Sequence, residues 1–274
     1  MTGHIRRKQS FIALAICALV AVCAPLSLRA AQSDIDGVDP ALIEDLVAAS
    51  RILVDQGVLD AFGHVSVRDP RDPGRYLMSR NLAPALVTAA DIMVFDVETG
   101  EPVDAQGRRV FLERFIHAAI YKSRPDVNAV VHSHSPSVIP FGIVASVPLQ
   151  PVFHMSGFLY AGVPIYEIRN DAGMSNMLIA NIELGRALAG VLADKSVVLM
   201  RGHGNVVAAP SIPVAVYRAV YTEVNARLQI QAIALGGPIN YLAPEEARKA
   251  GETTETQVRR PWELWKSKAM REAQ

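Results

Sequence analysis

Three histidines in two short motifs have the spacing and the side-chain chemistry of a metal site. His132 and His134 flank Ser133 directly after the apolar run 129–131. Side chains alternate between the faces of a strand, so both imidazoles are predicted to point the same way. His203 stands between two glycines, where a sharp turn would expose its ring. Each motif alone would also suit structural or solvated histidines. Together they predict a divalent metal site with one open position.

The ligand types restrict the metal without identifying it. Neutral imidazole suits zinc, and also manganese, iron or cobalt. The only two cysteines, Cys17 and Cys23, lie in an N-terminal apolar segment. Histidine and carboxylate are therefore the ligands available to the rest of the chain.

Glu113 is the candidate carboxylate, because it stands in the apolar stretch "VFLERFIHAAIY" just before the His132 motif. A carboxylate in such a setting needs a partner. It could pair with Arg114 or another arginine, or it could serve as a metal ligand or general base. His117, one helical turn later, is expected to be a core residue or to support the ligands. His64 and His154 are additional candidate proton donors.

A second group of polar residues follows two predicted strands and could hold substrate. His64, Ser66 and Arg68 alternate along "GHVSVR", and Ser79 with Arg80 follow the next strand. Arginine can hold a carboxylate through two parallel hydrogen bonds, although surface arginines are common. Ser66, Arg68, Ser79 and Arg80 are therefore predicted to bind a substrate carboxylate.

The N-terminus has the order of a secretory signal peptide. The basic residues 6–8 precede the apolar run "FIALAICALVAVCA", and small residues follow at Ala30 and Ala31. The run is shorter than the roughly 20 residues that a membrane-spanning helix needs, so a retained anchor is the less favoured alternative. We expect cleavage near residue 30 and export, with the periplasm as the destination.

The remaining composition indicates one globular domain that does not bind nucleic acid. The chain has 274 residues, half of them hydrophobic, and its 27 basic side chains balance 27 acidic ones. No basic tract offers nucleic acid a binding surface. We divide the chain into a signal peptide (1–30), a leader (31–39), a catalytic domain (40–243) and a C-terminal helical tail (244–274).

Hydrophobic periodicity predicts alternating helices and strands, which is typical of a layered α/β domain. Helices are expected at 40–56, 111–122, 176–192 and 212–235, with strands at 61–70, 76–79, 91–96, 129–134, 197–200 and 206–209. The motif "RGHGN" is predicted to form a hairpin turn between the last two strands.

Three motifs, in this order, resemble the class II aldolase/adducin family: "GHVSVR", "ERFIHAAIYKSRPDVNAVVHSHSP" and "RGHGNVVAA". The resemblance extends over roughly residues 40–235. It implies a three-layer α/β/α sandwich around a central mixed sheet. It also implies a metal bound by His132, His134 and His203, with Glu113 as acid/base and as a ligand when substrate is absent. Members of the family are commonly tetramers with active sites at subunit interfaces.

Differences from the sugar-phosphate aldolases of this family narrow the expected substrate. Those enzymes carry asparagine at the position of His64, a "TPTG"-like phosphate loop where this chain has Met78–Leu82, and a Ser-Ser pair at Phe111 and Leu112. The sequence is similar instead to a branch containing decarboxylases of hydroxylated aromatic or pyridine carboxylates, with prenylated-aromatic oxygenases nearby. A metal-dependent decarboxylase acting on a small carboxylate is the leading hypothesis. A ketose aldolase, an iron oxygenase and a non-catalytic adducin-like module are the alternatives.

Overall fold

The computed structural model describes residues 1–2 and 35–271. All but the first two residues of the predicted signal peptide, with both cysteines, and residues 31–34 of the leader lie outside that range. Across the described ranges, no helix has both the length and the apolar character needed to cross a bilayer.

A seven-stranded mixed sheet forms the centre of the fold. Its strands are β1 (His64–Arg68), β2 (Arg75–Ser79), β3 (Ile92–Asp96), β4 (Ala129–Ser133), β5 (Ile165–Tyr166), β6 (Val197–Met200) and β7 (Gly204–Ala209). The spatial order is β3-β2-β1-β4-β7-β6-β5. All neighbours run antiparallel except β5 and β6, which are parallel. β1 and β7 therefore flank β4, the strand that carries His132.

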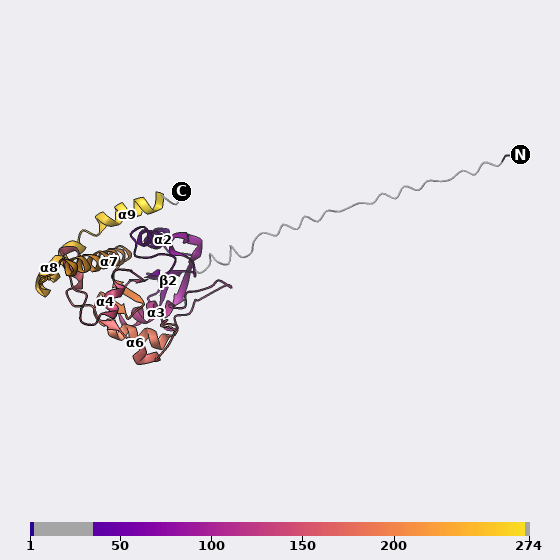
Figure 1. Ribbon diagram of the computed structural model, residues 1–274. Coiled ribbons are helices and arrows are strands. Elements are labelled where there is room, and N and C mark those ends of the chain that lie inside the picture. The colour runs from indigo at the N-terminus through magenta and orange to yellow at the C-terminus, as the bar shows by residue number, and fades with distance from the viewer. Residues whose placement is uncertain (3–34, 272–274) are drawn as a thin grey trace.

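Helices cover both faces of this sheet (Figure 1). α2 (Pro40–Asp55), α7 (Ile212–Leu235) and α9 (Arg259–Arg271) lie on one face, and α3 (Arg114–Ser123) and α6 (Ile182–Leu192) on the other. Alternate residues of a strand enter opposite cores: Leu77 packs with the first group of helices and Met78 with the second. The predicted three-layer α/β/α sandwich is confirmed.

The remaining elements lie in the connections between strands and near the C-terminus. They are η1 (Pro84–Leu86), η2 (Ala89–Asp91), α4 (Ile139–Ile143), η3 (His154–Leu159), α5 (Arg169–Ala172) and α8 (Pro244–Glu255). The predicted C-terminal tail packs on the domain. A Cβ atom on Gly157 of η3 would lie 2.4 Å from the Gly251 nitrogen of α8. α9 buries Trp262 and Ala269 in the same core as α2.

Two predicted helices begin later than expected. The helix predicted at 176–192 begins at Ile182, because the Asn181 side chain accepts a hydrogen bond from the Leu184 amide (2.9 Å) and caps the helix. The helix predicted at 111–122 begins at Arg114, with Glu113 at its N-cap. The Glu113 side chain makes no capping hydrogen bond, which leaves its carboxylate available to the neighbouring strands.

Gly63 brings β1 close to β4 just before His64. Its φ is +89°, and a Cβ atom there would lie 2.4 Å from Leu59 Cδ2 and 2.8 Å from the His132 carbonyl oxygen. Gly63→Ala should therefore lower the free energy of unfolding by about 2 kcal/mol or more, measured by urea denaturation. Gly190→Ala is the control, because this exposed glycine of α6 has open space around it. That change should be neutral or stabilise by up to about 1 kcal/mol. Equal stability of the two variants would contradict this role for Gly63.

Candidate metal centre

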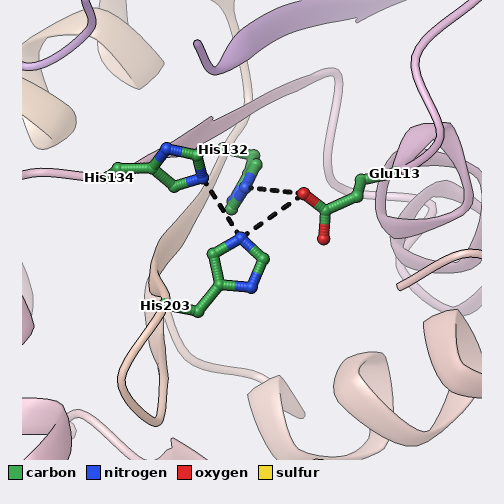
Figure 2. A group of neighbouring side chains, drawn as sticks. All are labelled: Glu113, His132, His134 and His203. Carbon is green, nitrogen blue, oxygen red and sulfur yellow. Dashed lines mark hydrogen bonds and ion pairs between the residues drawn. The ribbon is translucent and has the colours of Figure 1, made fainter. Parts of the chain in front are cut away.

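Four side chains from three parts of the fold converge at one end of the central strands of the sheet. His132 lies on β4 and His134 just after it, His203 lies in the turn between β6 and β7, and Glu113 precedes α3. One ligand atom from each lies within 4.8 Å of those of the others (Figure 2). Figure 2 shows the three rings and the carboxylate pointing toward one another. The predicted ligand set is therefore assembled in one place.

The distances within this cluster are those of groups that share a common point. Glu113 Oε2 lies 3.4 Å from His132 Nε2 and 3.4 Å from His203 Nε2. His203 Nε2 lies 3.1 Å from His134 Nε2. Glu113 is not paired with Arg114, the alternative left open by the sequence. Arg114 instead donates to both carboxylate oxygens of Glu101, at 2.7 and 2.8 Å.

Backbone carbonyls orient two of the imidazoles as ligands. His132 Nδ1 lies 3.2 Å from the Asn205 carbonyl oxygen, and His203 Nδ1 lies 3.0 Å from that of Met177. A carbonyl only accepts, so each Nδ1 carries the proton and each Nε2 keeps its lone pair for a metal. Within the described chain, the buried His132 Nε2 has no hydrogen-bond partner. These residues therefore fit a divalent ion.

Glu113 and the neighbouring histidines shift one another's pKa values. Burial raises the pKa of Glu113, but the charges of His132 and His203, whose Nε2 atoms both lie 3.4 Å from Oε2, outweigh burial and hold it well below its usual range. Burial lowers the pKa of His203, but its hydrogen bond and charge interaction with Glu113 prevail and raise it. Burial and the two neighbouring rings lower the pKa of His134 to about 4. Glu113 is therefore ionised at neutral pH.

These shifts predict how metal binding depends on pH. A metal binds the neutral imidazole, so a proton on His203 must leave first. Because the pKa of His203 is raised above 6.5, protons compete for this ring at higher pH than for a free histidine. Zn²⁺ affinity should fall by about tenfold per pH unit once the pH drops below that raised pKa. Competition with a coloured chelator between pH 8 and 5 measures this, and a constant affinity over that range would contradict it.

The segment before α6 also serves the cluster, which the sequence did not reveal. The Ile179 amide donates to Glu113 Oε1 (3.0 Å), and the Met177 carbonyl accepts from His203. Met177 has φ +69°, a conformation that non-glycine residues rarely adopt. Both contacts use backbone atoms, which leave no residue signature. The Asn181 cap was the one available sign that 176–180 is not helical.

His64 and Arg80 lie at the same end of the sheet as the metal ligands. His64 is paired with His132 across β1 and β4, and its ring is 5.2 Å from that of His132. Burial and the charges of His117 and His132 lower the pKa of His64 well below 6.5. Extending the β1–β2 register by two residues places Arg80 opposite His64. Arg80 Nε donates to Asp91 at 2.6 Å, and Ser79 is buried at the end of β2.

Arg68, Ser66 and His154 are not brought to the ligands. Arg68 is at the far end of β1 and donates to four backbone carbonyls, those of Pro73, Tyr121, Arg124 and Val127. Ser66 is fully buried against His117 and Tyr121. His154 is exposed in η3, where it lines a hollow with residues of α7 and the C-terminal helices. The substrate-binding roles predicted for Arg68 and Ser66 do not match these positions, since both side chains are engaged by the protein itself.

The fold and the cluster define an α/β/α protein with a histidine-rich cluster that could hold a metal ion. The family model of the class II aldolase and adducin N-terminal domain matches residues 44–230. The chain belongs to this family.

Curated relatives of this chain are decarboxylases. The chain is 38% identical over 245 residues to the decarboxylase tropJ of Talaromyces stipitatus, covering 81% of this chain and 92% of tropJ. It is 30% identical over 213 residues to the 3,4-dihydroxyphthalate decarboxylase of Arthrobacter keyseri, covering 73% and 82% of the two chains.

A solved structure of an aldolase has the same fold as this chain. The L-fuculose 1-phosphate aldolase of Glaciozyma antarctica is 26% identical and superposes with a TM-score of 0.68 over 84% of this chain and 88% of its own. Decarboxylases and aldolases both break carbon–carbon bonds. With its intact cluster of potential ligands, this chain is a lyase.

Proposed function

We propose that this chain decarboxylates a hydroxylated aromatic or related carboxylate, using a divalent metal ion held by His132, His134 and His203. The observation that carries the proposal is an aromatic side chain beside the cluster. Phe111 stands two residues before Glu113, and its ring is 4.6 Å from that of His64. An aromatic substrate can pack against such a ring, whereas a phosphate needs hydrogen-bond donors. The similarity to tropJ and to the dihydroxyphthalate decarboxylases supports the same reading.

The bound ion would act as a Lewis acid that stabilises negative charge on the substrate oxygens. Zinc and manganese are the proposed metals, and iron or cobalt would fit the same three imidazoles. One carboxylate and three histidines surround the position of the ion. Glu113 would bind the ion when substrate is absent and leave it when substrate enters.

Glu113 is proposed to move the proton of the reaction. In its ionised form it accepts the proton of a substrate hydroxyl. The bond between the ring and the carboxylate carbon then breaks, CO2 leaves, and the electron pair stays on the ring carbon. Glu113 returns its proton to that carbon, so the carboxylate is regenerated. A buried carboxylate next to the reacting atoms suits both steps.

Arg80 and His64 are the side chains placed to hold the substrate. Arg80 Nε donates a hydrogen bond to Asp91. This contact holds the guanidinium group at the metal end of the sheet. Its remaining N–H groups could bind a second carboxylate. His64, between Phe111 and His132, could bond to a substrate oxygen. Ser79 and His154 remain predicted contributors, and His154 would have to act from outside the cluster.

A substrate panel with metal-reconstituted protein tests this function. CO2 release from ortho-hydroxy aromatic and pyridine carboxylates would be compared with aldehyde release from ketoses and ketose phosphates, and with oxygen uptake. We expect CO2 release without oxygen consumption. Faster aldehyde release would support an aldolase, and oxygen uptake an oxygenase. A purified chain that binds no metal and turns over nothing would be a non-catalytic module.

We also propose that the chain forms a homotetramer whose active sites lie at subunit interfaces. Apolar side chains are exposed near the cluster: Phe62 is 64% exposed with its ring 6.3 Å from His134, and Ile143 is 58% exposed next to Gly202. Such a rim is suited to burial by another subunit. Light scattering of the purified protein would show the mass of four chains, and a monomer would exclude this arrangement.

Export remains a proposal that rests on the N-terminal sequence alone. The basic residues 6–8 and the apolar run after them support it. N-terminal sequencing of protein recovered from the periplasm would give a start near residue 31, and a retained signal peptide (1–30) would contradict cleavage.

A further inference from the structure

Four buried side chains form one continuous hydrogen-bonded chain that ends beside the metal ligands. His64 Nδ1 lies 2.6 Å from His117 Nε2, and His117 Nδ1 lies 2.6 Å from Ser66 Oγ. Ser66 Oγ lies 2.7 Å from the Tyr121 hydroxyl. His117 and Ser66 are fully buried, Tyr121 is 1% exposed and His64 is 5% exposed. We refer to His64, His117, Ser66 and Tyr121 as the buried relay.

The His64 end of this relay faces the reaction site. Its ring lies 5.2 Å from that of His132 and 4.6 Å from that of Phe111. Nδ1 is bonded to His117, so Nε2 is the ring atom left for a substrate. His64 is not one of the four clustered ligand residues. It therefore has a role distinct from holding the ion.

The relay has two hydrogen-bond directions in which the buried Ser66 hydroxyl is paired, because its single hydrogen goes either to His117 or to Tyr121. Either every hydroxyl and N–H points toward His64, or every one points away from it. The two rings cannot both carry a proton on the nitrogens that face each other at 2.6 Å. The direction therefore decides whether His64 Nε2 carries a hydrogen.

The far end of the relay favours the direction toward His64. Tyr121 is buried, and Ser66 Oγ is the acceptor that the described residues offer to its hydroxyl hydrogen. That hydrogen would be left unpaired if Tyr121 accepted from Ser66, so Tyr121 donates to Ser66. Ser66 then donates to His117 Nδ1, and His117 Nε2–H donates to His64 Nδ1. A substrate carboxylate or phenolate oxygen only accepts, so it requires a donor at Nε2.

We propose that Ser66, His117 and Tyr121 are positioning residues that hold His64 as the Nε2–H tautomer beside the metal ligands, where it donates a hydrogen bond to the substrate. The catalytic part of this inference rests on the proposed decarboxylation. The tautomer of His64 does not rest on that function, because it is a property of the folded protein. The relay also explains why Ser66, a residue predicted to bind substrate, lies away from the ligands.

Nitrogen NMR of the imidazoles tests the tautomer without any assay of activity. In Zn²⁺-loaded, ¹⁵N-histidine-labelled protein, long-range ¹H–¹⁵N spectra distinguish Nδ1–H from Nε2–H rings. His64→Asn identifies the His64 signals by their loss. We expect His64 and His117 both to be Nε2–H in the unaltered protein. A His64 that carries its proton on Nδ1 would overturn the proposal.

Ser66→Ala tests whether the relay acts on His64. It removes the donor to His117 Nδ1, so both rings should populate the other tautomer. With the best substrate of the panel, kcat should fall by about tenfold or more, while KM and zinc content change by less than about twofold. Ser50→Ala is the matched control, since this buried serine of α2 donates to the Leu46 carbonyl of its own helix and to no other group among the described residues. It should match the unaltered protein.

The outcomes separate the two proposals. Unchanged tautomers and unchanged kcat in Ser66→Ala would overturn the positioning role. If no substrate of the panel releases CO2, the proposed function fails, and the NMR spectra still decide the state of His64. If Ser66→Ala does not fold, the tautomer of the unaltered protein decides alone.

Discussion

Glu113→Gln is expected to lower kcat by about 10²- to 10⁴-fold while the protein keeps its metal. The amide has the shape of the carboxylate but cannot accept and return a proton. Three imidazoles remain to bind the ion, with His132 and His203 still oriented by backbone carbonyls. Steady-state kinetics and elemental analysis of the purified variant measure the two quantities.

Glu101→Gln is the matched control for this change. Glu101 bonds to Arg114, the residue next to Glu113, but is an exposed side chain outside the cluster. Turnover of this variant should stay close to that of the unaltered protein. Undiminished turnover in Glu113→Gln would refute the acid/base role. Loss of metal together with turnover would show that Glu113 acts chiefly as a ligand.

His203→Ala is expected to remove both metal and activity. His203 Nε2 lies 3.1 Å from His134 Nε2 and 3.4 Å from Glu113 Oε2, so its loss leaves one side of the cluster open. Metal affinity should fall by more than the roughly 10- to 100-fold that loss of an outer-shell partner costs. Chelator treatment followed by added metal should restore the unaltered protein and leave the variant inactive.

His154→Ala serves as the control for metal content. This ring is exposed in η3 and is not among the clustered ligand residues, so the variant should bind metal as the unaltered protein does. Full metal content and turnover in His203→Ala would show that the cluster is not the metal site.

Much of the fold was predictable because the local patterns are strong. The helix predicted at 212–235 and the strand at 197–200 have the bounds that the structure shows, since apolar periodicity and flanking turn residues mark both clearly. The helix predicted at 176–192 was wrong in its first six residues. There, backbone groups serve His203 and Glu113 instead of one another, and no hydrophobic pattern records such contacts.

The ligand residues were predictable from side-chain chemistry and spacing. His132 and His134 are two residues apart at the end of a strand, and His203 lies in a glycine-flanked turn, although its side chain is only 10% exposed. The roles of the arginines were not predictable in this way. Arg68 is the last residue of β1, and Arg80 directly follows β2. Because β1 and β2 run antiparallel, the two arginines lie at opposite ends of the sheet, and only Arg80 is at the end that carries the metal ligands.

The sequence by itself determined the kinds of ligand, the family and the layered α/β architecture, because these depend on residue type and local periodicity. Only the tertiary structure decided which polar side chains meet. It placed Glu113 at a helix N-cap facing three imidazoles, turned Arg68 toward backbone carbonyls, and joined His64 to His117, Ser66 and Tyr121. The physical reason is that hydrogen bonds and metal ligation depend on distances between groups far apart in the chain, which packing of the two cores against the sheet sets.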